Sequence, residues 1–74
     1  MVEWAETETL GCTRCTATVG DYALSIVGNG SEYVWVVWQQ NRIVFQGMER
    51  SLASAKLTVE AVVRWAQNGP EGAG

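Results

Sequence analysis

Histidine is absent from this chain of 74 residues, so it lacks the side chain that most often acts as a general base near neutral pH and most often binds metal. Basic residues are also few, with five Lys and Arg against eight Asp and Glu and a net charge of −3. Because nucleic-acid binders need positive charge to neutralise phosphates, this balance argues against a nucleic-acid partner.

Long hydrophobic runs are missing too. No stretch approaches the roughly 18 to 20 apolar residues that a transmembrane helix needs, and we expect no membrane partner. The N-terminus reads Met-Val-Glu-Trp-Ala-Glu, which is acidic where a signal peptide would be basic. We therefore expect a small cytoplasmic protein. At 47% hydrophobic and 18% charged residues the chain is globular, and four tryptophans supply large apolar area to bury.

The chain divides into three parts by composition. Residues 1–11 carry three glutamates, and Trp4 is their bulky side chain, so we expect an acidic arm in which Trp4 plugs an apolar surface. Residues 12–68 have the patterns of a single small domain. Residues 69–74 are predicted to be a disordered tail.

The first half of the domain predicts a β-hairpin. Apolar and polar residues alternate over 13–19 and again over 22–27, which is the period of half-buried strands. Gly20-Asp21 between them suits a type II′ turn. A two-residue turn sets Val19 opposite Tyr22 and Ala17 opposite Leu24, so the apolar sets of the two strands coincide.

Two further strands follow. A three-residue loop over Gly28-Asn29-Gly30 sets Leu24 opposite Val34, and a turn around Gln40-Asn41 then starts the fourth strand. This register predicts a core face of Val34, Val36, Trp38, Ile43 and Phe45. The outer face then holds Tyr33, Trp35, Val37 and Val44. A bulge in either turn would exchange the two sets.

The C-terminal part of the domain predicts an amphipathic helix. Ser51 is suited to cap its N-terminus by accepting the backbone N–H of Ser54. Glu60 and Arg64 have the spacing of a helical ion pair, and Gly69-Pro70 should end the helix. The predicted buried stripe is Leu52, Ala55, Val59, Val62 and Ala66. The fold class is thus α+β, a four-stranded antiparallel meander with one C-terminal helix packed on one face.

Cys12-Thr-Arg-Cys15 resembles half of a zinc or redox site. One pair supplies two of the four ligands that tetrahedral zinc takes, so a site would need two copies of the chain. Residues three apart on a strand point to opposite faces, too far apart for a disulfide. We therefore interpret both as structural thiols, with zinc across a dimer and redox chemistry as alternatives. We expect no cofactor, no small-molecule substrate and no enzymatic activity.

The outer-face residues are the strongest functional candidates. Tyr33, Trp35, Val37 and Val44, together with Trp4, are predicted to bind a protein, because aromatic residues concentrate where partners dock. Three alternatives remain for this face. The N-terminal arm could cover it, or a second copy of the chain could cover it in a homodimer. Its aromatic residues could also stack on single-stranded nucleic acid, although the basic residues that such a surface needs around it are missing.

The string Tyr22-x-Leu24, Trp35-x-x-Trp38, Gly47, Ser51 and Ala55-Lys56 resembles small uncharacterised proteins of bacteriophages and mobile elements. In these proteins a β-meander precedes a helix that begins at a Ser-capped turn, and the resemblance covers about residues 20–66. It implies the fold given above. It also implies a non-enzymatic module that binds a host protein in the host cytoplasm, as anti-CRISPR inhibitors do.

Overall fold

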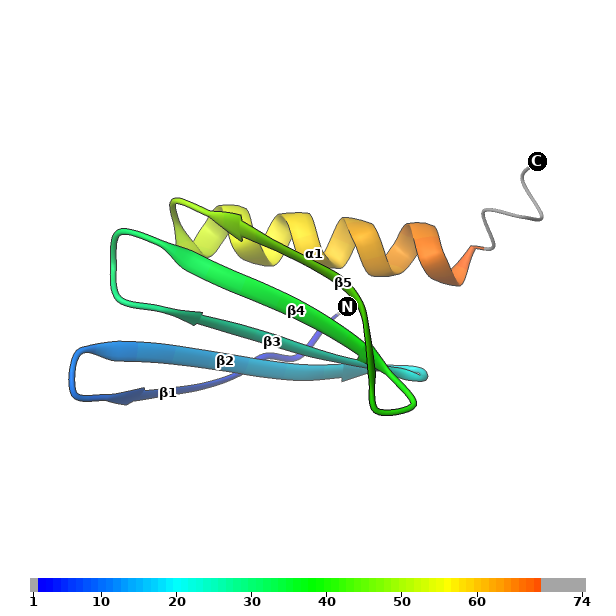
Figure 1. Ribbon diagram of the computed structural model, residues 1–74, viewed down its shortest axis with the longest axis horizontal. Helices are drawn as coiled ribbons and strands as arrows, with labels where there is room; N and C mark the ends of the chain where they lie inside the picture. Colours follow the sequence, from blue (N-terminus) through cyan, green and yellow to red (C-terminus); the bar gives the residue numbers. More distant parts are fainter. Residues whose placement is uncertain (1, 69–74) are drawn as a thin grey trace.

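The computed structural model describes residues 2–68, which form one antiparallel sheet and one helix (Figure 1). The elements are β1 (Ala5–Thr9), β2 (Cys12–Val19), β3 (Tyr22–Gly28), β4 (Tyr33–Gln39), β5 (Arg42–Glu49) and α1 (Leu52–Gln67). Each strand pairs with its neighbours in sequence, and α1 packs on β3, β4 and β5. The α+β class is confirmed, but the described residues form five strands, so the prediction of four is wrong.

The additional strand is β1, within the predicted acidic arm. It pairs with β2 so that Glu6 lies opposite Cys15 and Thr7 opposite Arg14. Leu10 and Gly11 form the turn, with φ values of 53° and 81°, as a type I′ hairpin turn requires. Every side chain of β1 is exposed. The sequence pattern missed this strand because an edge strand without buried side chains shows no apolar alternation.

The β2–β3 hairpin has the predicted register. Val19 pairs with Tyr22 and Ala17 with Leu24. Gly20 has a φ of 58°, which is the left-handed conformation that the first central position of a type II′ turn needs. Local turn chemistry and apolar alternation agree here, and together they fixed the pairing.

The loop between β3 and β4 differs from the prediction and reverses the facing of β4. It spans residues 29–32, so Leu24 lies opposite Val37 instead of Val34. Asn29 organises the loop, because its Oδ1 accepts the backbone N–H of Ser31 at 3.2 Å. A register shift by an odd number of residues moves every side chain of a strand to the other face. The predicted core and outer sets of β4 are therefore exchanged.

A bulge in β5 separates two residues that were predicted to share a face. The turn at Gln40-Asn41 has two residues, both with positive φ, and it pairs Trp38 with Ile43. The register then shifts, and Val37 pairs with Phe45, which leaves Val44 as the extra residue. Phe45 consequently faces α1, whereas Ile43 lies on the opposite side of the sheet.

The helix has the predicted N-cap, because Ser51 Oγ accepts the backbone N–H of Ser54 at 3.1 Å. Its fully buried residues are Ala55, Val59 and Val63. Val63 was absent from the predicted stripe, whereas three predicted members are only half-buried, namely Leu52, Val62 and Ala66. The predicted helix end at Gly69-Pro70 lies outside the described residues.

The core lies between α1 and the face of the sheet that α1 packs against, which we call the covered face. Its buried members from the sheet are Cys15, Ala17, Leu24, Ile26, Trp35 and Val37. Two aromatic residues of this face lie opposite glycines: Tyr33 pairs with Gly28 and Trp35 with Gly47. A Cβ at Gly47 would lie 2.5 Å from Trp35 Cζ2. The missing side chains thus give the rings room to lie against the neighbouring strands.

Candidate protein-binding surface

The structure places most of the predicted binding residues on the covered face. Trp35 is 7% exposed and Val37 is fully buried, and Tyr33 packs against the same core. The prediction that these three side chains lie on an open face is wrong, because the four-residue loop shifts the register of β4 and so turns these side chains to the covered face. Val44 remains 39% exposed, at the bulge.

Trp4 is also engaged within the chain. It is half-buried, packs against the core and donates its Nε1–H to Glu60 Oε2 at 2.8 Å. Lys56 Nζ lies 4.0 Å from Glu6 Oε1, which links the next part of the N-terminal segment to the same helix. Trp4 therefore covers an apolar surface as expected, but that surface is on the helix side of the sheet. The described residues show no ion pair between Glu60 and Arg64.

The opposite side of β3, β4 and β5 has no covering element among residues 2–68, and we call it the uncovered face. Its residues follow from the pairing, because directly opposed residues of antiparallel strands share a face. They form three rows across the sheet, which are Ala23, Trp38 and Ile43, then Ser25, Val36 and Gln46, then Val27, Val34 and Met48.

Large apolar side chains dominate the uncovered face. Val34 is 45% exposed, Ile43 54% and Met48 57%. Val36 and Trp38 are half-buried. Single exposed apolar residues are normal on a protein surface, but a contiguous group is typical of an interaction site. The sequence pattern predicted that Val34, Val36, Trp38 and Ile43 belong to the core face. It thus grouped these residues correctly but assigned them to the wrong side of the sheet.

Charge is almost missing from this side of the sheet. The same rows continue onto β2 and β1 mainly with threonines, and Arg14 is the one charged side chain among the described residues whose pairing puts them there. Glu6, Glu49 and Arg42 all share the covered side through their pairs. Charges are depleted at the centre of protein interfaces because desolvating them is costly. The rows of β3, β4 and β5 have this property, and Asp21, in the turn before β3, lies at the end of the face, beside Ala23 and Trp38.

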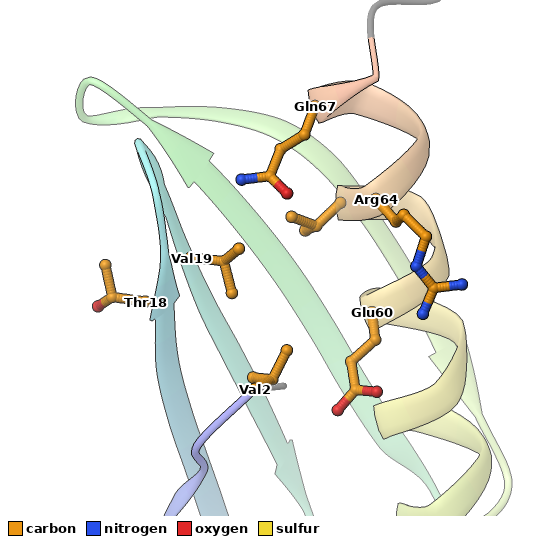
Figure 2. Close-up of a pocket in the computed structure, with 7 residues that line it drawn as sticks. Val2, Thr18, Val19, Glu60, Arg64 and Gln67 are labelled. Carbon is orange, nitrogen blue, oxygen red and sulfur yellow. The ribbon is translucent and has the colours of Figure 1, made fainter.

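A hollow lies between α1 and β2. Figure 2 shows Val2 and Val19 projecting toward the helix, which contributes Glu60, Arg64 and Gln67. The hollow has a volume of about 480 Å³. Glu60 at its side already accepts the Trp4 hydrogen bond, so this site is partly occupied by the chain's own N-terminal segment. Because the chain itself already fills part of this hollow, it is a poorer candidate than the uncovered face.

The two cysteines lie on opposite faces, as their spacing predicted. Cys12 is exposed and Cys15 is fully buried. Burial raises the pKa of the Cys15 thiol, and the nearby Glu6 carboxylate raises it further, while Lys56 acts in the opposite direction. A buried thiol with a raised pKa is a poor nucleophile. Within residues 2–68, no three His, Cys, Asp or Glu side chains gather as a metal site would require.

The described part of the chain has no helix with the length and apolar character to cross a membrane. A scan against protein-family models and searches of curated proteins and of solved structures found no match for this chain.

Proposed function

We propose that this chain is a small non-enzymatic protein-binding module that docks its partner through the uncovered face. The observation that carries the proposal is the group of exposed apolar residues on β3, β4 and β5, in rows that contain no charge. Removing these side chains from water favours association by roughly 25 cal/mol per Å² of apolar area before the costs of binding. No buried charge would oppose that gain at the centre of the face.

Trp38 is the proposed anchor of this surface. It lies in the row between Ala23 and Ile43, and it remains partly accessible. Trp38 lines a hollow together with Asp21, Ala23, Gln40 and Asn41. Tryptophan is enriched among residues whose truncation costs most binding energy. The other aromatic side chains of β3–β5 lie on the covered face, so Trp38 is the aromatic residue that this surface offers.

Two protein partners are open to this face: a protein of the host, which the resemblance to phage proteins favours, and a second copy of the chain. Single-stranded nucleic acid receives less support. Bases stack on several aromatic side chains within a basic groove, whereas the uncovered face offers Trp38 as its aromatic side chain. The one basic side chain that pairing places on that side of the sheet, Arg14, lies outside the face on β2, and the net charge of the molecule is −3.

Retention of a partner on the tagged protein tests this function. The bait is incubated with nuclease-treated lysate of the source cell, as wild type, as Trp38→Ser and as Leu57→Ser. Leu57 is 70% exposed on α1, outside the uncovered face, and provides the matched loss of an exposed apolar side chain. We expect a stoichiometric protein to be retained by wild type and Leu57→Ser and lost by Trp38→Ser.

Circular dichroism provides the folding control. Trp38→Ser should keep the wild-type spectrum, since the side chain is on the open side of the sheet. Trp35→Ser should unfold the domain, because removing a buried tryptophan costs about 3 to 5 kcal/mol. Retention that is unchanged in Trp38→Ser but lost in Leu57→Ser would refute the proposed surface.

A further inference from the structure

We infer that the partner fitting the uncovered face is a second copy of this chain, stacked face to face about a two-fold axis parallel to β4. The inference rests on the proposed function, since it uses the same docking face, and it names the occupant. A two-fold interface must be complementary to itself, so each residue has to suit the residue that the rotation brings opposite it. The pairing of β3, β4 and β5 allows that requirement to be examined row by row.

The axis runs parallel to β4 in the plane between the two stacked sheets, directly over this strand. The rotation keeps every residue in its own row and places β3 of one copy over β5 of the other. Ser25 then lies opposite Gln46, so the polar side chains of the face meet each other. In the next row Ala23 lies opposite Ile43, which places the smallest side chain against a large one. Two packed sheet faces need polar side chains that meet each other and large side chains that meet small ones, and this arrangement provides both.

The residues of β4 lie nearest to the axis. Val34, Val36 and Trp38 each face their own copies, and all three are uncharged and apolar. Val27 and Met48 complete the outer row, again one β-branched and one long flexible side chain. Val36 is the middle one of these three residues, so it lies at the centre of the overlap.

Electrostatics favour this arrangement for two acidic molecules. Each copy has a net charge of −3, and a face with buried carboxylates would repel its double. Here the overlapping strands contribute no charge to the interface. Arg14 lies on β2, opposite Val27, and the rotation places it beyond the partner copy's β5 at the rim. A charge at the rim stays hydrated and costs little.

The size of the overlap predicts the strength of the dimer. Three strands spaced about 4.8 Å apart and about seven residues long, with their side-chain margins, offer roughly 500 Å² per copy. The total of about 1,000 Å² is at the lower end of specific interfaces. We therefore expect a reversible dimer that dissociates on dilution, and not a permanent one.

Site-directed crosslinking tests the geometry in the full chain. In a Cys12→Ser background, where the remaining native thiol is the buried Cys15, Val36→Cys is compared with Leu57→Cys using a short bismaleimide. Val36 lies beside the axis and should give a covalent dimer in high yield. Leu57 is exposed on the helix and should leave the protein monomeric, and circular dichroism verifies that both variants are folded.

Sedimentation velocity over a range of concentrations measures the equilibrium. The wild type should shift from monomer to dimer as the concentration rises. Val34→Lys places two ammonium groups beside the axis and should raise the dimer dissociation constant at least about thirtyfold. Leu57→Lys adds the same charge elsewhere and should leave that constant within a factor of about two.

The outcomes separate this inference from the proposed function. A wild type that stays monomeric at all concentrations, or a dimer that Val34→Lys does not weaken, overturns the second copy as the occupant. In that case, capture of a different protein that depends on Trp38 leaves the proposed function standing. A monomer whose capture of any partner is indifferent to Trp38 overturns both.

Discussion

Two glycines decide how the aromatic residues of β4 are accommodated. Gly28 and Gly47 lie on either side of this strand, opposite Tyr33 and Trp35, and each aromatic ring occupies the space that a side chain would fill. Trp35 Nε1 is buried without a hydrogen-bond partner among the described residues, at a cost of about 1 to 3 kcal/mol. The packing of the indole ring between Gly47 and the helix must outweigh that cost.

Gly47→Ala tests this packing. Alanine normally stabilises a strand relative to glycine by roughly 0.5 to 1 kcal/mol. Here the added Cβ would lie 2.5 Å from Trp35 Cζ2, and we expect a net loss of about 1 to 3 kcal/mol. Urea unfolding of wild type, Gly47→Ala, Trp35→Leu and the double variant measures it. Most of the loss should disappear in the Trp35→Leu background, and purely additive effects would contradict the account.

The buried thiol of Cys15 predicts a dependence of stability on pH. Its pKa is raised in the folded state above the ordinary value of 9.0, so the unfolded chain loses this proton at lower pH. The free energy of unfolding is therefore unaffected by this group below about pH 9 and falls as the pH rises through the folded pKa. Cys15→Ala should lose this dependence.

The measurement is the difference in unfolding free energy between wild type and Cys15→Ala at about pH 8 and about pH 10.5. It should shift in favour of Cys15→Ala at the higher pH. Cys12→Ala is the matched control, because Cys12 is exposed, and its difference from wild type should stay constant. An equal pH dependence in both variants would exclude Cys15 as the cause.

At the scale of elements, the N-terminal segment is part of the fold. Residues 5–9 complete the sheet as β1, and Trp4 joins the helix through Glu60. Val2 lines the hollow between α1 and β2, and Figure 2 shows it directed toward Glu60. The helix itself packs on β3–β5, and this segment lies beside it on the covered face.

Trp4→Phe measures the contribution of the Trp4–Glu60 hydrogen bond. Phenylalanine keeps most of the apolar contact but removes the N–H donor, and we expect a loss of about 1 kcal/mol in unfolding free energy. Glu60→Gln keeps an acceptor oxygen and should cost less. In a Glu60→Ala background, Trp4→Phe should have a smaller effect. Equal effects in both backgrounds would show that the bond contributes nothing to stability.

The elements also show how far local patterns predict structure. The Gly20-Asp21 turn, the β2–β3 register and the Ser51 cap depend on neighbouring residues, and all three were predicted correctly. The β3–β4 loop was not, because glycine and asparagine suit loops of several lengths. The register of β4 is shifted from the predicted one by an odd number of residues, and this shift moves Tyr33, Trp35 and Val37 together to the covered face. The opposed glycines were the signal in the sequence, but they become visible only once the register is known.

At the scale of the whole molecule, one helix is available for a sheet with two apolar faces. Figure 1 shows α1 on one side of β3–β5, with β1 and β2 at the far edge. The covered face buries the core, whereas Val34, Ile43 and Met48 on the other face remain exposed. This excess of apolar surface is the physical basis of both proposals, since a protein or a second copy can remove it from water.

The sequence by itself determined the α+β class, the helix with its Ser51 cap, and the presence of more apolar strand surface than one helix covers. Periodicity and turn chemistry are local, so they can be deduced from adjacent residues. Only the tertiary structure decided which surface is left open. That choice depends on the loop at 29–32 and the bulge at Val44, where one residue more or less exchanges the faces of a strand. It is this exchange that buries Trp35 and leaves Trp38 for a partner.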